Sequence, residues 1–311
     1  MPTPATCWAI FWVTAKRSAF WATAKRSTLF LGAAAVLLPL SSAQAAGQHI
    51  EKHFTVSTHP VLTIQNATNG RIEVKSWKNP EVVIAGNRAS AKVAVEMEQA
   101  ANRIGLSTTI LDKSAKPAEV ETTFDITVPE ESELQIHTTS MGTIYVEQVY
   151  GDMTLESVAG DVHLKEVSGY IIVKTVSGSL QCMQCAGKLN FASISGSAQF
   201  LQPQLNNLNV STTSGNILYD GDFLRDGIYT MKSGMGLVEV RFSGSDSFDL
   251  KAQTTSGTVD NQAQDFLKPD SHGLKHLSSK FAKSLAGSVN AGLAQVNLSS
   301  FSGTIRIRKR D

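Results

Sequence analysis

Apolar and polar residues alternate through the middle of the chain in a pattern that repeats every nine residues. Each repeat begins with a glycine, at Gly142, Gly151, Gly160, Gly169, Gly178, Gly187 and Gly196. The second residue after each glycine is apolar: Ile144, Met153, Val162, Ile171, Leu180, Leu189 and Ala198. So is the fourth: Val146, Leu155, Leu164, Val173, Cys182, Phe191 and Phe200. Because residues two apart in an extended strand share a face, each repeat predicts a short strand with these two positions buried.

The seventh position of each repeat is also apolar, although it lies in an otherwise polar turn. These residues are Val149, Val158, Val167, Val176, Cys185 and Ile194. A solvent-exposed hairpin tip does not need an apolar residue there, so we expect an inward-facing corner, with glycine permitting the bend. Strands joined by such corners would stack into a parallel β-solenoid filled by rows of aliphatic side chains, right-handed by the general bias of parallel crossovers.

The outward charges indicate how many residues make one coil. A nine-residue coil would stack Glu147 on Glu156 and Lys165 on Lys174, which is unfavourable. An eighteen-residue coil pairs Glu147 with Lys165 and Glu156 with Lys174 instead. A coil of 27 residues also separates like charges, so the charges alone leave it open. The ladder continues in two steps of nineteen, which favours a coil of about eighteen: Gly196, Gly215 and Gly234.

The rest of the chain shows the same alternation in looser form. Strand patterns run from Phe54 to Ile136 and continue after residue 200, so residues 46–311 are predicted to form one all-β domain with its regular repeats at 142–200. Residues 261–293 lose the alternation and are predicted to form an irregular inserted loop, with a short helical turn from Ser279 to Leu285. The pattern returns near Val296, and we expect the last strand to cap the solenoid.

Residues 1–45 differ from the rest, with four basic residues, no acidic residue and a short apolar run from Leu29 to Leu40. This is typical of a signal peptide, with cleavage near Ala45 and Ala46. No second apolar span follows, so the mature chain is expected to have no transmembrane segment and to be periplasmic, extracellular or at the cell surface.

Without the leader, the chain contains 24 basic and 27 acidic residues, which gives a net charge of about −3. Such a chain lacks the basic field that nucleic acid requires. The terminal cluster of basic residues is interpreted as a charged last strand that blocks end-to-end stacking: Arg306, Arg308, Lys309 and Arg310.

Cys182 and Cys185 form a Cys-x-x-Cys, but both fall on inward positions and no second pair with metal-ligand spacing follows. We expect core packing, with a disulfide if a bend brings the two residues together. Calcium and other metals are not expected, because the repeats lack Gly-Gly-x-Gly-x-Asp and an aspartate follows the glycine only at Asp152 and Asp161. Those two carboxylates would face opposite ways in an eighteen-residue coil, and His163 has no evident partner. Neither catalysis nor a cofactor is therefore predicted, although a solenoid polysaccharide lyase or hydrolase remains an alternative.

Several segments resemble a bacterial family of putative adhesins built from β-strand repeats and classed as a domain of unknown function. They are Val61 to Ile64, Asn69 to Trp77, Phe124 to Pro129, the serial Val-Ser-Gly units and Ser302 to Ile307. The resemblance covers residues 54–307, and it implies an exported, non-enzymatic solenoid with an adhesin-like role at the cell envelope. An envelope protein or a glycan would be its partner, and the exposed residues to inspect first are Tyr145, Tyr170 and Ile172. The alternative is a structural or envelope-stress component that self-associates through its ends.

Overall fold

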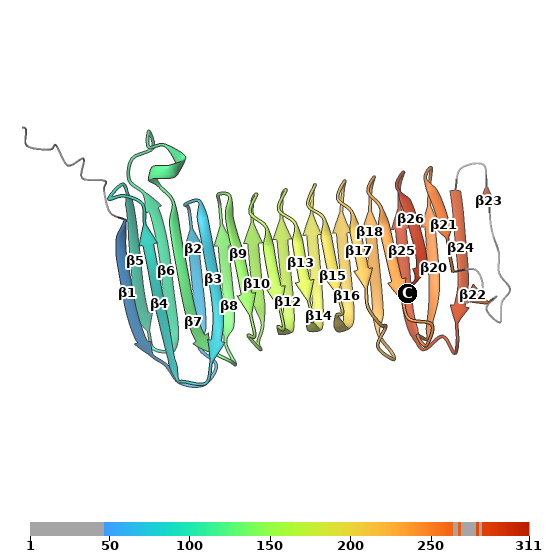
Figure 1. The fold of residues 1–311 in the computed structure, drawn as a ribbon, viewed down its shortest axis with the longest axis horizontal. Coiled ribbons are helices and arrows are strands. Elements are labelled where there is room, and N and C mark those ends of the chain that lie inside the picture. The colour runs from blue at the N-terminus through green and yellow to red at the C-terminus, as the bar shows by residue number, and fades with distance from the viewer. Residues whose placement is uncertain (1–46, 264–266, 269–277, 280–281, 311) are drawn as a thin grey trace, which may run out of the picture. The chain divides into compact units, whose positions relative to one another are not determined.

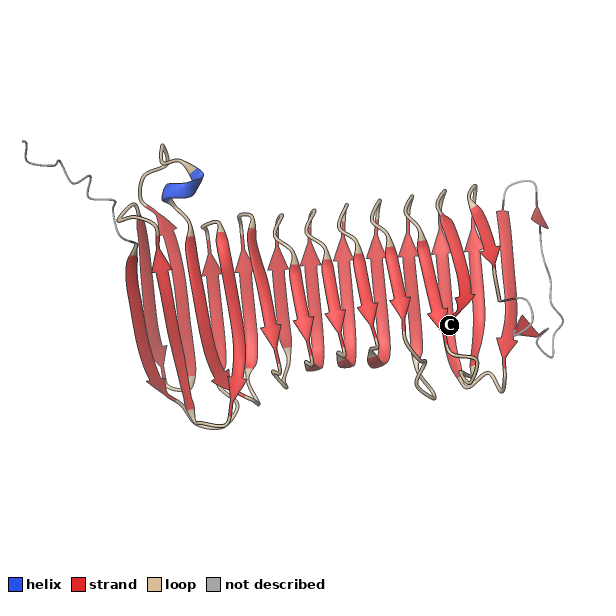
Figure 2. Ribbon diagram, viewed as in Figure 1, coloured by secondary structure: helices blue, strands red, loops and turns tan. Residues whose placement is uncertain are grey.

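The computed structural model describes residues 47–263, 267–268, 278–279 and 282–310. The predicted signal peptide and its cleavage near Ala45 and Ala46 lie outside these residues. The described residues all belong to one compact unit. Its described strands make two sheets, joined by short turns along two edges (Figure 1, Figure 2).

Sheet A contains twelve strands. In spatial order they are β1 (Gln48–Thr55), β4 (Glu81–Arg88), β7 (Thr122–Pro129), β3 (Gly70–Trp77), β9 (Gly142–Glu147), β11 (Val162–Lys165), β13 (Leu180–Met183), β15 (Ala198–Leu201), β17 (Ile217–Asp220), β19 (Val238–Phe242), β26 (Thr304–Lys309) and β21 (Thr258–Asn261).

Sheet B contains fourteen strands, and thirteen of them follow one path. These are β22 (Leu267–Lys268), β24 (Ala282–Val289), β20 (Phe248–Thr254), β25 (Ala294–Ser300), β18 (Ile228–Ser233), β16 (Gln204–Thr212), β14 (Ala186–Ser193), β12 (Ser168–Thr175), β10 (Met153–Ser157), β8 (Glu133–Thr138), β2 (Val61–Asn66), β6 (Arg103–Ile110) and β5 (Val93–Ala100). β23 (Ser278–Ser279) pairs with β24, and a 3-10 turn, η1 (Pro117–Glu119), joins β6 to β7.

The inward rows of the core confirm the predicted strand positions. All fourteen residues at the second and fourth places of the repeats are at most 2% exposed. They alternate between the two sheets, so the apolar side chains of both sheets meet in one continuous core. The structure is therefore the parallel β-solenoid that the period predicted. Its handedness stays a prediction.

Strand register confirms a coil of eighteen residues and rules out 27 for the regular part. Val162 lies beside Ile144 in sheet A, and Ile171 lies beside Met153 in sheet B. The predicted charge pairs form as well: Lys165 Nζ lies 2.5 Å from Glu147 Oε1, and Lys174 Nζ lies 3.0 Å from Glu156 Oε1. Later coils are longer than expected, because Val238 pairs with Ile217 and Gly236, rather than Gly234, stacks on Gly215.

The prediction that every seventh-place residue points inward is wrong for every second turn. Val149, Val167 and Cys185 are buried, but the alternate residues Val158, Val176 and Ile194 are 41%, 45% and 58% exposed. The cause is the serine or threonine that directly precedes each of these exposed residues. Ser157 Oγ, for example, lies inside the turn and bonds both the backbone N–H and the carbonyl oxygen of Gly160. Thr175, Ser193 and their counterparts take the same inward place, so the next residue turns outward.

Both ends of the solenoid depart from chain order. At the C-terminal end, β25 and β26 lie between the coil β18–β19 and the earlier coil β20–β21, to which they run parallel. The prediction that the last strand caps the solenoid is therefore wrong. The predicted helical turn from Ser279 to Leu285 is also wrong, because Ala282–Val289 forms β24, antiparallel to β20. At the other end, β1, β4 and β5 run antiparallel to their neighbours.

Candidate functional site

A polar strip crosses the outward face of sheet A at the middle coils. One column contains Tyr145, His163, Gln181 and Gln199, which occupy matching positions on β9, β11, β13 and β15. The rings of Tyr145 and His163 stack with their centroids 4.6 Å apart, and His163 Nδ1 lies 3.0 Å from Gln181 Oε1. The guanidinium of Arg71 lies over the Tyr145 ring, 5.8 Å from its centroid. The column thus places aromatic and amide groups side by side.

A second column runs beside the first, where the strands of sheet A begin. Asp161 Oδ1 accepts the backbone N–H of Ser179 at 2.8 Å, Ser197 Oγ accepts that of Asn216 at 3.1 Å, and Asn216 Oδ1 accepts that of Leu237 at 2.8 Å. Each side chain therefore bonds the next coil and leaves its other hydrogen-bonding capacity toward solvent. The two columns together form the polar strip.

Two shallow hollows lie along this strip. The first, of about 310 Å³, is lined by residues that include Tyr145, His163, Gln181 and Met183. The second, of about 420 Å³, shares His163 and Gln181 and extends to Gln199, Asn216 and Leu218. The shared residues make them neighbours, so an extended ligand crossing the strands would contact both.

The charges beside the strip neutralise one another. Lys165 pairs with Glu147, and Arg71 Nη2 lies 2.7 Å from Glu73 Oε2. Hydrogen bonding from Lys165 lowers the pKa of Glu147 below its ordinary 4.5, so the carboxylate stays ionised and paired at neutral pH. This surface is therefore suited to an uncharged ligand rather than to a polyanion.

The three exposed residues named from the sequence are not brought together. Tyr145 lies on sheet A, whereas Tyr170 and Ile172 lie on β12 in sheet B. Tyr170 is 43% exposed and its hydroxyl accepts a hydrogen bond from Asn190 at 2.9 Å, while Ile172 is half-buried. The amides and hydroxyls of the polar strip were missed, because polar outward positions occur in every repeat and the sequence alone does not rank them.

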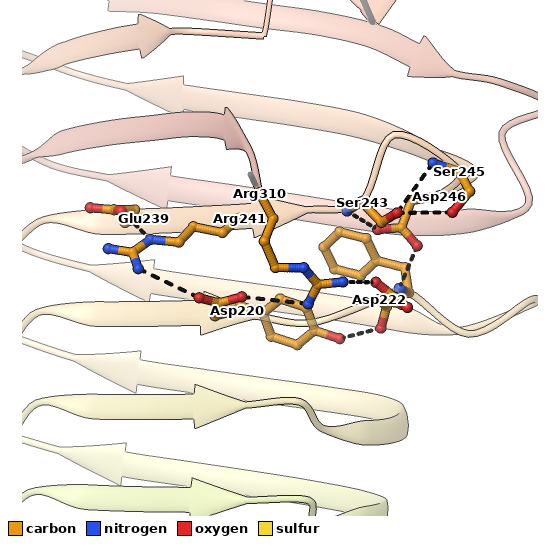
Figure 3. A network of polar contacts seen from close by, with 10 residues as sticks. Asp220, Asp222, Glu239, Arg241, Ser243, Ser245, Asp246 and Arg310 are labelled. Carbon is orange, nitrogen blue, oxygen red and sulfur yellow. Dashed lines mark hydrogen bonds and ion pairs between the residues drawn. The ribbon is translucent and has the colours of Figure 1, made fainter.

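The basic residues near the C-terminus form ion pairs inside the sheet, and β26 lies between β19 and β21, so the interpretation of a charged last strand that blocks end-to-end stacking is wrong. Arg310 contacts Asp220 and Asp222, and Arg241 lies between Asp220 and Glu239 (Figure 3). Arg306 Nε also lies 3.0 Å from Asp260 Oδ2. Together with the bond of Arg308 to Glu239, these contacts tie β26 to β21 and β19, and Arg310, which directly follows β26, to β17. Because β26 lies between strands that carry acidic residues, its arginines have negatively charged partners.

An aromatic cluster lies beneath that network. Tyr219 and Phe223 stack with centroids 4.8 Å apart, and Phe248 packs at 4.7 Å from Phe223. Burial raises the pKa of the Asp246 carboxyl above 3.8, although the backbone N–H groups of Ser243 and Phe223 bond it at 2.8 and 3.2 Å. Asp246 therefore anchors two loops and is not presented to a ligand.

The candidate cysteine and carboxylate sites take structural positions. Cys182 and Cys185 are fully buried and joined by a disulfide, with their Cα atoms 5.9 Å apart, because the backbone bends at Gln184. Mass spectrometry with and without reduction would test the bond, since reduction adds two hydrogens. Asp152 accepts the N–H of Tyr170 on the sheet B side, so it lies apart from Asp161. Within the described ranges no cluster of three potential metal ligands occurs, and no helix is both long and apolar enough to span a bilayer.

Comparison with known proteins places these features in a family. No curated protein matches the chain significantly. Three solved bacterial structures share 11–13% identity with it, and each alignment covers 85% of this chain. A "putative cell adhesion protein" of Clostridium sporogenes is covered over 100% of its length (TM-score 0.27), and a "putative adhesin" of Bacteroides fragilis over 97% (TM-score 0.36). A "putative lipid binding protein" of Parabacteroides distasonis is also covered over 97% (TM-score 0.32).

The family model described as Toastrack DUF4097 matches residues 54–308, which is nearly all of the chain that the structure describes. This match confirms the resemblance found in the sequence. The chain belongs to the Toastrack DUF4097 family.

Proposed function

We propose that this chain is an exported, non-enzymatic binding protein of the cell envelope with an adhesin-like role, and that it binds an extended, uncharged glycan along the polar strip. The observation that carries the proposal is the continuity of the strip. Amide and hydroxyl groups recur at matching positions on successive coils, beside the stacked rings of Tyr145 and His163. Export is supported by the leader sequence.

A repeating ligand suits a repeating surface. Neighbouring strands lie about 4.8 Å apart, so a polymer running across them meets equivalent hydrogen-bonding groups at regular intervals. Aromatic rings supply apolar contact area while amides and hydroxyls fix orientation. Each contact with one sugar unit is weak. Because the units of a polymer are covalently linked, binding of one raises the effective concentration of the next, and the overall affinity exceeds that of a single contact.

Two observations favour this proposal over the alternatives. The carboxylates Asp152 and Asp161 each accept a backbone N–H and lie toward different sheets, which disfavours a paired-carboxylate hydrolase. At the N-terminal end of the solenoid, edge strands β1 and β5 carry charged residues, which disfavours end-to-end association there.

The test is binding of the purified chain from Gly47 to a panel of neutral and acidic polysaccharides by isothermal titration calorimetry. A double variant Tyr145→Ala/Gln181→Ala should weaken binding of a neutral glycan about tenfold or more, since it removes both stacking and hydrogen-bonding groups. Tyr170→Ala is the matched control, because that tyrosine is similarly exposed on the opposite sheet.

Equal loss in both variants would refute the assignment to sheet A. Preference for acidic polysaccharides, abolished by salt, would refute the uncharged ligand. Turnover of any polysaccharide that disappears in Asp161→Asn would replace binding by catalysis.

A further inference from the structure

A row of exposed apolar side chains follows one edge of the solenoid. It consists of the outward tips of the eight turns from sheet B to sheet A that follow β8 along the chain, at the upper edge in Figure 2. Six tips carry large apolar residues that are 41–67% exposed: Met141, Val158, Val176, Ile194, Met235 and Phe301. Thr213 and Thr255 occupy the tips of two further coils. We call these eight residues the apolar ridge.

The tip segments carry no charge. Residues 139–142, 158–160, 176–178, 194–196, 213–215, 234–236, 255–257 and 301–303 contain only apolar residues, glycine, serine and threonine. The opposite edge differs, because its turns contain Asp152, Glu166, Asp222, Arg225 and Asp226. The eight tip segments are therefore uncharged, whereas Asp161 directly follows one of them and the loop between β6 and β7, at the same edge in Figure 2, carries Asp112, Lys113, Lys116, Glu119 and Glu121.

The backbone N–H groups of the ridge and several neighbouring serine hydroxyls are bonded within the protein. Backbone N–H groups bond the tip of the preceding coil: Ser177 to Val158 O at 3.0 Å, Thr213 to Ile194 O at 3.1 Å and Met235 to Thr213 O at 3.0 Å. The exposed hydroxyls of Ser177, Ser195, Ser214 and Ser256 also donate back to tip carbonyls. An apolar medium tolerates backbone only where its polar groups are satisfied internally, and the backbone N–H groups of all eight ridge residues have partners within the protein.

From these observations we propose that the apolar ridge inserts into the outer layer of a lipid bilayer and holds the solenoid on its edge against an uncharged membrane surface. The ridge protrudes as a single row, one side chain for each coil. At about 4.8 Å between coils it is roughly 34 Å long and one side chain wide, so ridge-on-ridge contact with a second copy would bury well under the ~800 Å² per partner of a stable dimer. Lipid can surround a narrow protruding row, and insertion by about 5–10 Å is enough for interfacial binding.

Charge supports lipid of neutral headgroup as the occupant. The tip segments offer no cation to an anionic headgroup, and the chain beyond the leader carries a small net negative charge. Binding should therefore be insensitive to salt, in contrast to polybasic membrane attachment. This proposal is independent of the glycan strip, which lies on the face of sheet A.

The experiment is co-sedimentation of the chain from Gly47 with vesicles of pure phosphatidylcholine, and with vesicles in which part of the lipid is phosphatidylglycerol. Omitting the apolar leader prevents it from binding the vesicles itself. The ridge variant Ile194→Ser/Phe301→Ser should bind phosphatidylcholine about tenfold or more weakly, because it removes two large exposed side chains from the row. The matched control Tyr150→Ser/Leu224→Ser removes comparable exposed side chains from the opposite edge and should bind as the unaltered chain does.

A second variant, Phe301→Trp, reports insertion directly through a blue shift of its fluorescence on phosphatidylcholine vesicles. Unchanged circular dichroism of all variants is expected, because the substituted side chains are exposed. Absence of co-sedimentation, equal loss in the ridge and control variants, or binding that requires phosphatidylglycerol and disappears with salt would overturn the proposal. A concentration-dependent dimer abolished by Ile194→Ser/Phe301→Ser would assign the ridge to a second copy instead.

Discussion

Replacing Gly178 by alanine tests why glycine recurs in this solenoid. A Cβ at Gly178 would lie 2.0 Å from the carbonyl oxygen and 2.7 Å from the carbonyl carbon of Gly160 in the neighbouring coil. A carbon and an oxygen that are not bonded require about 3.3 Å, so the coils would have to separate locally by more than 1 Å, roughly a quarter of the ~4.8 Å strand spacing. Close approach of stacked backbones, rather than freedom to bend, therefore makes glycine necessary at this position.

The magnitude follows from the contacts that such a separation would break. The bond from Ser177 N–H to Val158 O, at 3.0 Å, and that from Val162 N–H to Ser179 O, at 2.8 Å, flank the stacked glycines. Losing both costs about 2 kcal/mol, and residual backbone strain adds about 1–3 kcal/mol. We expect Gly178→Ala to lower the free energy of unfolding by about 3–5 kcal/mol.

Gly142→Ala is the matched control in the same row. There the nearest atom to an added Cβ is Asn66 Nδ2 at 3.2 Å, and the nearest backbone atom is Thr68 O at 3.5 Å. Its cost should be within about 1 kcal/mol, because only a side chain has to adjust. Urea unfolding followed by circular dichroism measures both, and hydrogen exchange localises the damage. Equal stability changes in the two variants would refute the close-approach explanation.

Three further predictions concern the core, one charge pair and the C-terminal coil. Leu164→Asp should abolish cooperative thermal unfolding, because it buries an unpaired charge, whereas His163→Ala should cost less than about 1 kcal/mol. Hydrogen bonding from Lys174 holds the pKa of Glu156 below 4.5, so the pair stabilises the fold above that value and its contribution disappears as pH falls below it. In Lys174→Met, the free energy of unfolding measured with urea should therefore fall less steeply between neutral and acidic pH. Deleting residues 294–311 should remove hydrogen-exchange protection from β20 and β21 while β10 to β14 stay protected, since β25 and β26 separate the last coil from the rest. Protected β20 and β21 would contradict that order.

The regular core could be predicted because its cause is local. A strand exposes alternate residues to opposite faces, so Leu164 and Val146 could be placed inside from spacing alone. Charge pairs such as Glu147 with Lys165 then set the coil length, because neighbouring outward positions interact. Both inferences depend only on the repeat itself.

Whether the seventh residue of a repeat points inward or outward also depends on the sequence, through the residue at the sixth position. The sixth residue of each repeat alternates between Gln or Glu, as at Gln148 and Glu166, and Ser or Thr, as at Ser157 and Thr175. The hydroxyl residues turn inward to bond the glycine backbone, whereas Gln148, Glu166 and Gln184 take positive φ and leave the inward place to the following residue. Apolar character at the seventh position therefore has two different causes.

The order of the terminal coils could not be predicted, because it depends on pairing between segments far apart in the chain. Val296 and Ile305 have the same strand pattern whether their coil is the last or is inserted before it. Only the partners decide: β26 gains Asp260 on one side and Glu239 on the other, which satisfies arginines that would otherwise stand unpaired on an edge strand. From the sequence alone, the arginines of β26 are therefore expected on an edge strand, whereas they lie between strands that carry acidic partners.

The apolar ridge and the polar strip occupy different sides of one rigid framework, and this relation limits what the protein can do at a surface. Asp161 of the strip directly follows Gly160 of a tip segment, so the strip begins beside the ridge, and the column of His163 lies two residues, about 7 Å, further along the strand. If the ridge enters the headgroup region by about 5 Å, the strands stand upright on the membrane and sheet A faces sideways along it, with the strip near but outside the lipid. A glycan bound there would run parallel to the membrane surface, across successive coils. Attachment to lipid and binding of an envelope polymer are thus compatible, and lipid vesicles should leave the glycan affinity unchanged. Competition between the two ligands would mean that they share one surface and that the ridge and the strip do not act separately.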